Sequence, residues 1–210
     1  MRVLYRHGSR SVATTRAQPI SLILDIGQGA GLAGATGIRP FLPPLLVGAL
    51  ARADAGIDFD GTAYAFLESP WFLAAVLAAA VASYAAGRRA PDATAVVVGT
   101  GVLATVIGAL LFAGALDDGG RDGLPGLPGG AACALLGYLA VSGLLAGARR
   151  RLGEGDGSLI PVYADAAALA LALVAVFAPP LGVLSIPLFG YLLVARRRRP
   201  EKHAGLRILR

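Results

Sequence analysis

The sequence has little charge, few histidines and a single cysteine, and each shortage excludes a class of protein. Only 15% of the 210 residues are charged and 56% are hydrophobic, whereas about a quarter of a soluble domain is charged. Together with a mean hydropathy of +0.67, this predicts an integral membrane protein. Cys133 alone excludes an intrachain disulfide framework. Because the only histidines, His7 and His203, lie in opposite tails, we expect no metal centre and no cofactor.

The basic residues outnumber the acidic ones by 19 to 13, and all but one are arginine. In a soluble protein this excess would suggest nucleic-acid binding. Here the arginines mostly flank apolar runs, as residues that set membrane topology do, so we expect no nucleic acid partner. The preference for arginine, together with abundant alanine and glycine, is typical of a high-GC bacterial genome. We therefore predict a protein of the bacterial cytoplasmic (inner) membrane.

Six apolar stretches predict an all-α membrane protein with about six transmembrane helices, at residues 20–51, 71–87, 93–116, 131–148, 159–178 and 181–195. The segments between them alternate between acidic (52–70, 117–130) and arginine-rich (88–92, 149–158). By the positive-inside rule this alternation predicts a multi-pass protein with both termini cytoplasmic. We expect a disordered basic arm at 1–19, a six-helix domain at 20–195 and a basic tail at 196–210.

Six crossings divide into two sets of three that would enter the membrane from opposite sides. Each set opens on a glycine-rich span, and each has a serine and a proline before its next span (Ser69-Pro70; Ser158 with Pro161). This pattern suggests an inverted three-helix repeat, the common plan of secondary transporters. A duplication that served only bundle stability would give the same pattern.

Glycines in the first stretch match a nucleotide-binding motif but favour helix packing. Gly29 to Gly34 reads GxGxxG, yet that fingerprint requires a soluble strand–helix unit around it. Gly27 and Gly31 instead form GxxxG, which lets two membrane helices approach closely.

The segment Gly37-Ile38-Arg39-Pro40-Phe41-Leu42-Pro43-Pro44 breaks the first predicted helix beside an arginine. An arginine near the bilayer centre costs about 2.5–3.5 kcal/mol, so it needs a partner or a function. One hypothesis is a site for a phosphate or carboxylate, formed by Arg39, Pro40, Pro43, Gly37 and Asp165. The other is a structural ion pair of Arg39 with Asp165 or Asp25.

Two other acidic residues have simpler interpretations, and no catalytic set is apparent. Asp25 is expected to reach the cytoplasmic interface, and Glu68 to be solvated or to cap the second helix. Asp165 could instead carry a coupling proton. Since no nucleophile and base are paired in the sequence, we expect no enzyme, and a lipid-modifying enzyme is the least favoured hypothesis.

Two segments, GATGIRPFLPPLLVGALAR (34–52) and FDGTAYAFLESPWFLA (59–74), resemble bacterial integral membrane proteins of the family called domain of unknown function 4126. The resemblance covers about residues 22–195, and Asp165 stands where the family looks acidic. It implies a membrane protein in which the Arg39 segment matters, and it assigns no activity.

These observations leave two functional hypotheses. The first is a small transporter or lipid flippase for a substrate with an anionic group, an anionic lipid or a small anion, bound by Arg39. The second is a non-transporting scaffold or subunit of a larger membrane complex, which binds a membrane protein partner through the Gly27 and Gly31 face. Both have membrane lipids as partners, and both are compatible with a homo-oligomer.

Overall fold

A computed structural model describes residues 14–89, 94–156 and 159–197, and all the regular structure in these residues is helical. The elements are α1 (Thr14–Ile38), α2 (Leu42–Ala51), the short 3-10 helix η1 (Ala65–Glu68), α3 (Pro70–Arg89), α4 (Thr94–Asp118), α5 (Gly126–Asp156), α6 (Ile160–Phe177), α7 (Pro179–Gly182) and α8 (Ser185–Arg197). Most of the predicted tails lies outside the described residues, although α1 begins within the predicted arm.

Within the described residues, four helices are long and apolar enough to cross a membrane, over Pro70–Gly87, Thr94–Asp118, Gly126–Leu145 and Ile160–Phe177. Leu42–Ala51 and Pro179–Ala195 are shorter apolar helices. Large apolar side chains such as Val81, Val102 and Leu188 are exposed on the outside of the bundle, as in a protein whose solvent is lipid. The predicted all-α, multi-pass membrane protein is confirmed.

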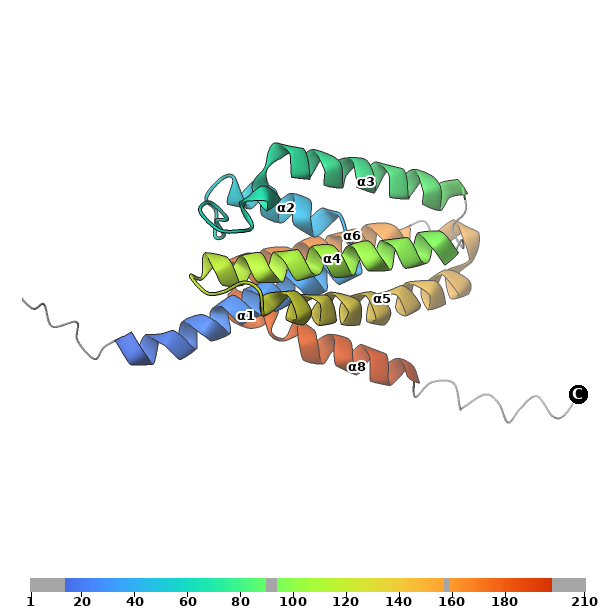
Figure 1. Ribbon diagram of the computed structural model, residues 1–210. Helices are drawn as coiled ribbons and strands as arrows, with labels where there is room; N and C mark the ends of the chain where they lie inside the picture. The colour runs from blue at the N-terminus through green and yellow to red at the C-terminus, as the bar shows by residue number, and fades with distance from the viewer. Residues whose placement is uncertain (1–13, 90–93, 157–158, 198–210) are drawn as a thin grey trace, which may run out of the picture.

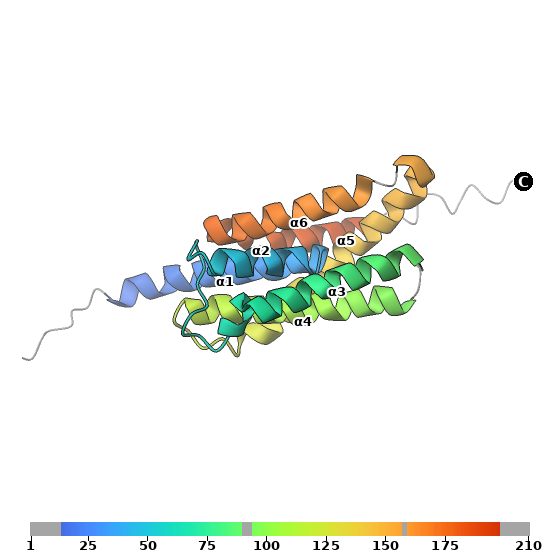
Figure 2. The same ribbon diagram turned by 90° about the horizontal axis from the view of Figure 1, so that it is seen from above.

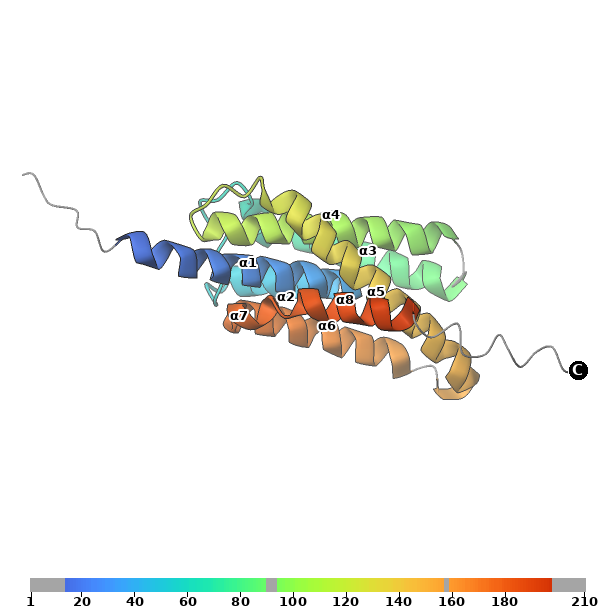
Figure 3. The same cartoon turned by 90° about the horizontal axis from the view of Figure 1, so that it is seen from below.

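Helix α1 lies at the centre, packed against α4, α5 and α6 (Figures 2 and 3). Its Ala30, Leu32 and Ala33 have no exposed surface. A side chain at Gly27 would collide with the backbone carbonyl of Pro179 in α7. The glycines therefore serve close helix packing as predicted, but they do so inside the chain.

Helices α1 and α2 form an antiparallel hairpin. Arg39, directly after α1, contacts Asp165 near the start of α6, whereas Gly56, after α2, packs against Phe177 at its end. The side-chain amide of Gln28 in α1 also donates a hydrogen bond to the Gly56 carbonyl, at 3.2 Å. The chain thus returns to the level of Gln28. The prediction that residues 20–51 cross the membrane once is wrong, because the break after Ile38 reverses the chain instead of bending it.

The hairpin changes where the ends of the described chain lie. Helix α1 begins at the end of the bundle that holds segments 52–69 and 119–125, called here the acidic end (Figure 1). Helix α8 ends at the opposite, arginine end, where α3 ends at Arg89 and where the arginines 149–151 of α5 lie (Figure 1). The described helices therefore begin and end at opposite ends of the bundle, while the number of crossings and the side of each terminus stay predictions.

The helix directions agree with the suggested inverted three-helix repeat once α1 is set aside. Helices α2 and α4 run toward the acidic end and α3 runs away from it, whereas α5 and α8 run away from the acidic end and α6 runs toward it (Figures 1 and 3). Corresponding helices of two inverted halves have opposite directions in this way. Helix α1 runs parallel to α5 and is an additional central helix, and the repeat itself stays a prediction.

Candidate functional site

The break between α1 and α2 is short and comes from proline chemistry. Pro40 disfavours the helical conformation at Arg39, so α1 ends at Ile38. Pro43 lies in the first turn of α2, where the missing N–H costs no hydrogen bond. The irregular backbone is therefore confined to residues 39–41, and it is shorter than the segment from Gly37 to Pro44 in which the sequence predicts a break.

The tip of this hairpin places Arg39 against the first turns of α6. Its Nη2 donates a hydrogen bond to the carbonyl oxygen of Pro161 at 3.0 Å. Its Nε lies 2.5 Å from Oδ1 of Asp165. This N–H is not aligned for a hydrogen bond, and Nε is buried without a hydrogen-bond partner among the described residues. The contact with Asp165 is thus an ion pair by distance and an incomplete one by geometry.

Arg39 lies within the spanning part of the bundle, toward its arginine end, and is not sealed within it. It follows Asp25 of the acidic end by 14 positions, or about 21 Å of helix, in a hydrocarbon layer about 30 Å thick. The side chain of Arg39 nevertheless keeps 28% of its surface exposed, and that of Asp165 keeps 41%. Both side chains of this charged pair are therefore partly exposed, so a third polar group can reach them.

The other predicted site residues surround the tip without facing outward. Gly37 is buried, and a side chain there would collide with the carbonyl of Ala134 in α5. Pro40 is also buried, and Pro43 is among the most buried residues of the chain. These three residues hold the tip in place, while Arg39 and Asp165 present the polar groups.

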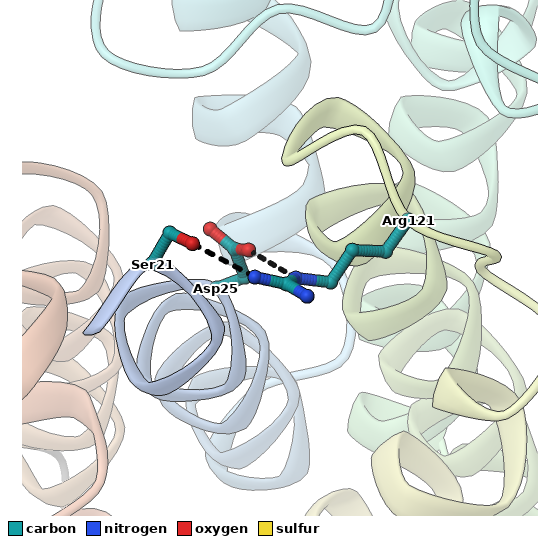
Figure 4. A network of polar contacts seen from close by, with 3 residues as sticks. All are labelled: Ser21, Asp25 and Arg121. Carbon is teal, nitrogen blue, oxygen red and sulfur yellow. Dashed lines mark hydrogen bonds and ion pairs between the residues drawn. The ribbon is translucent and has the colours of Figure 1, made fainter. Parts of the chain in front are cut away.

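A second ion pair lies at the acidic end. Arg121, from the segment between α4 and α5, places its Nε 2.9 Å from Oδ2 of Asp25, and its Nη2 donates to the hydroxyl of Ser21 at 2.8 Å (Figure 4). Asp25 is therefore not the partner of Arg39. Because Asp25 touches Arg121, the expected cytoplasmic position of Asp25 and the expected outer position of the acidic segment 117–130 cannot both be correct.

Three carboxylates that sequence reasoning did not group also meet at the acidic end. Asp58, Asp60 and Glu68 place one oxygen each within 4.8 Å of one another. Burial, a hydrogen bond with Asp60 and the charges of Asp60 and Asp58 raise the pKa of Glu68. Carboxylate oxygens are the ligands that Ca²⁺ and Mg²⁺ prefer. In the sequence, the spacing of Asp58 and Asp60 was the one feature that could have pointed to this cluster. A polar pocket of about 420 Å³ adjoins Asp60 and Glu68.

Spanning helices around a central hairpin, with charged groups at its tip, define a multi-pass, all-helical membrane protein. The model of the family described as Domain of unknown function (DUF4126) matches residues 26–199. The chain therefore belongs to this family, which confirms the resemblance of its Arg39 segment. No curated protein and no solved structure matches the chain.

Proposed function

We propose that this protein is a transporter or lipid flippase for a substrate with an anionic group, and that Arg39 binds that group. The observation that carries the proposal is the partly exposed Arg39–Asp165 pair at membrane depth. An arginine has five N–H donors in a planar fork that suits phosphate and carboxylate. Asp165 and Pro161 contact only two of its three nitrogens in the described residues.

In this mechanism the carboxylate of Asp165 occupies the position of the substrate's anionic group when no substrate is bound. When the site is empty, its carboxylate neutralises Arg39, which could not otherwise remain charged at low cost in hydrocarbon. An arriving phosphate or carboxylate competes for the same guanidinium and displaces Asp165. When the substrate leaves, Asp165 pairs again with Arg39, so that neither state strands an unpaired arginine.

Reconstituted protein tests the proposal in two arms that separate the sources of the anion. One arm follows translocation of a fluorescent anionic phospholipid across vesicles, and the other follows uptake of inorganic phosphate. We expect activity in one arm and its loss in Arg39→Ala. Arg121→Gln is the matched control, because Arg121 has the same exposed fraction, 28%, and also pairs with one aspartate. Activity that survives Arg39→Ala in a folded, inserted protein would overturn the proposal.

The scaffold hypothesis loses the residues on which it was based. Gly27 faces Pro179, and Gly31 faces Ala175 and Gly182, all within the same chain. A partner helix would have to displace α7 to reach them. Helix α3 is the most exposed of the candidate spanning helices among the described residues, because only 6% of its spanning segment is buried. Lipid suits such a surface equally well, so nothing specific favours this second function.

A further inference from the structure

Asp165 is the one acidic residue of α6, and it lies inside the spanning segment of that helix. The segment begins at Ile160, so Asp165 lies five residue steps, or about 7.5 Å of helix, within it. The neighbouring Val162 and Tyr163 are 59% and 72% exposed on the outside of α6, a surface that suits lipid. A carboxylate at this position stays ionised at low cost only while it is paired.

Arg39 is the cation that faces Asp165 among the described side chains. The structure describes two other arginine side chains, Arg52 and Arg121, which lie in the segments that follow α2 and α4. Both segments belong to the acidic end, whereas Asp165 lies near the start of α6, toward the arginine end (Figure 1). A carboxylate displaced from Arg39 therefore finds no second cation among these side chains.

The elements that pack against α6 offer few other titratable groups in the described part of the chain. Helices α2 and α7 contain none. In α1, Asp25 is already paired at the acidic end. In α5, the Tyr138 hydroxyl donates to a backbone carbonyl of α4, and Cys133 packs against a hydrophobic cluster. On α6 itself, Tyr163 lies on the exposed face. Asp165 is thus the group whose charge responds when the arginine changes its partner.

The net charge of the site determines what must accompany an anion. When the site is empty, Arg39 and Asp165 together are neutral. An anionic group on Arg39 beside an ionised Asp165 would leave one net negative charge inside the spanning segment. If Asp165 takes up a proton, the loaded site is neutral again. A neutral carboxylic acid costs far less at this position than an unpaired carboxylate does.

We propose that the binding of a singly charged anionic group to Arg39 is coupled to the uptake of one proton by the carboxylate of Asp165, so that the two are transported together. This inference rests on the transport function proposed above and adds its coupling ion. The proton comes from the water on the side where the anion enters. On release both leave to the other side, and Asp165 pairs again with Arg39. Because no net charge moves, a pH gradient drives the transport and a membrane potential does not.

Binding measured against pH tests the coupling without any need for transport. The probes are dihexanoyl phosphatidylglycerol for a lipid headgroup and dimethyl phosphate for a free anion, because the single charge of a phosphodiester does not change near neutral pH. For the full chain in mild detergent, we expect the dissociation constant of the probe that binds to rise about tenfold per pH unit wherever Asp165 is ionised in the empty protein. Calorimetry in buffers of different ionisation enthalpy should give one proton taken up per probe bound.

Two variants assign the proton to Asp165. Asp165→Asn is neutral in both states, so its dissociation constant should not change with pH and should lie below that of the wild type at the highest pH. Asp165→Glu keeps the carboxyl group and should keep the tenfold slope. Asp25→Asn is the matched control, because Asp25 is also paired with one arginine, and it should keep the slope as well.

The possible failures separate the two proposals. No proton uptake by the wild type, or a wild-type slope in Asp165→Asn, would overturn the coupling and leave the transport proposal standing. The calorimetric result needs only the wild type, so it decides even if Asp165→Asn does not fold. Unchanged binding by Arg39→Ala would overturn the transport proposal and this coupling with it. Binding of neither probe at any pH, by the wild type or by Asp165→Asn, would likewise overturn both.

Discussion

Removing Asp165 should destabilise the protein more than removing its partner Arg39. In Asp165→Asn the arginine stays charged without a counter-ion, because a guanidinium does not lose its proton. In Arg39→Gln the stranded carboxylate can take up a proton and become neutral. The two single variants therefore differ although they delete the same contact.

The exposure of the pair sets the magnitude. Deleting one partner of a buried ion pair costs about 3–5 kcal/mol, whereas an exposed pair contributes about 0–1 kcal/mol. With 28% and 41% of the two side chains exposed, this pair lies between these limits. We expect Asp165→Asn to lower the free energy of unfolding by about 2 kcal/mol and Arg39→Gln by about 1 kcal/mol.

Reversible unfolding in mixed micelles with increasing dodecyl sulfate measures these changes. The double variant Arg39→Gln/Asp165→Asn completes the cycle, and we expect it to be more stable than Asp165→Asn alone, with a coupling energy of about 1–2 kcal/mol. The pair Asp25→Asn and Arg121→Gln is the control cycle at the acidic end. A coupling energy of zero, or an Arg39→Gln variant less stable than Asp165→Asn, would refute this reasoning.

Three further predictions follow from the hairpin, the central helix and the acidic end. In a Cys133→Ala background, the variants Leu22→Cys and Leu124→Cys should react with a membrane-impermeant maleimide from the same side of the vesicle, because Asp25 touches Arg121. Labelling from opposite sides would mean that residues 20–51 cross the membrane once. Gly37→Leu should lower the unfolding free energy by 2 kcal/mol or more, since its side chain would meet Ala134, whereas Gly99→Leu has open space; equal losses would refute this packing. Because the pKa of Glu68 is raised above its ordinary value near 4.5, its stabilising contribution is present below that value and is lost as the pH rises through the folded-state pKa. Glu68→Gln should remove this part of the pH dependence of unfolding, and an unchanged profile would contradict it.

The sequence predicted the helices better than it predicted the path between them. Apolar length located α3, α4 and α6 within a few residues, because a spanning helix needs about 20 apolar residues whatever its neighbours are. The break at Arg39 and Pro40 was also correct, since proline acts locally. The direction that the chain takes after the break does not depend on the local sequence. Three irregular residues can either bend a helix or reverse the chain, and the packing of α2 beside α6 decides between the two.

The charge pattern did not reveal the reversal of the chain within residues 20–51, for a related reason. The arginine-rich connections 88–92 and 149–158 alternate with acidic ones whether residues 20–51 cross once or return, so only the placement of the basic arm distinguished the two paths. For the site, Asp165 and Asp25 were both candidate partners of Arg39 in sequence. The unbroken helix α1 excludes Asp25, because it places this residue about 21 Å from Arg39.

The central claim is that Asp165 competes with an anionic substrate for Arg39. The most direct test is native mass spectrometry of the anionic species retained by the wild type, Arg39→Gln and Asp165→Asn, with Arg121→Gln and Asp25→Asn as matched controls. We expect opposite changes: the species is lost in Arg39→Gln, becomes more abundant in Asp165→Asn and is unchanged in both controls. A parallel loss in Arg39→Gln and Asp165→Asn, or no change in either, would contradict it and leave the pair a structural link between the hairpin and α6.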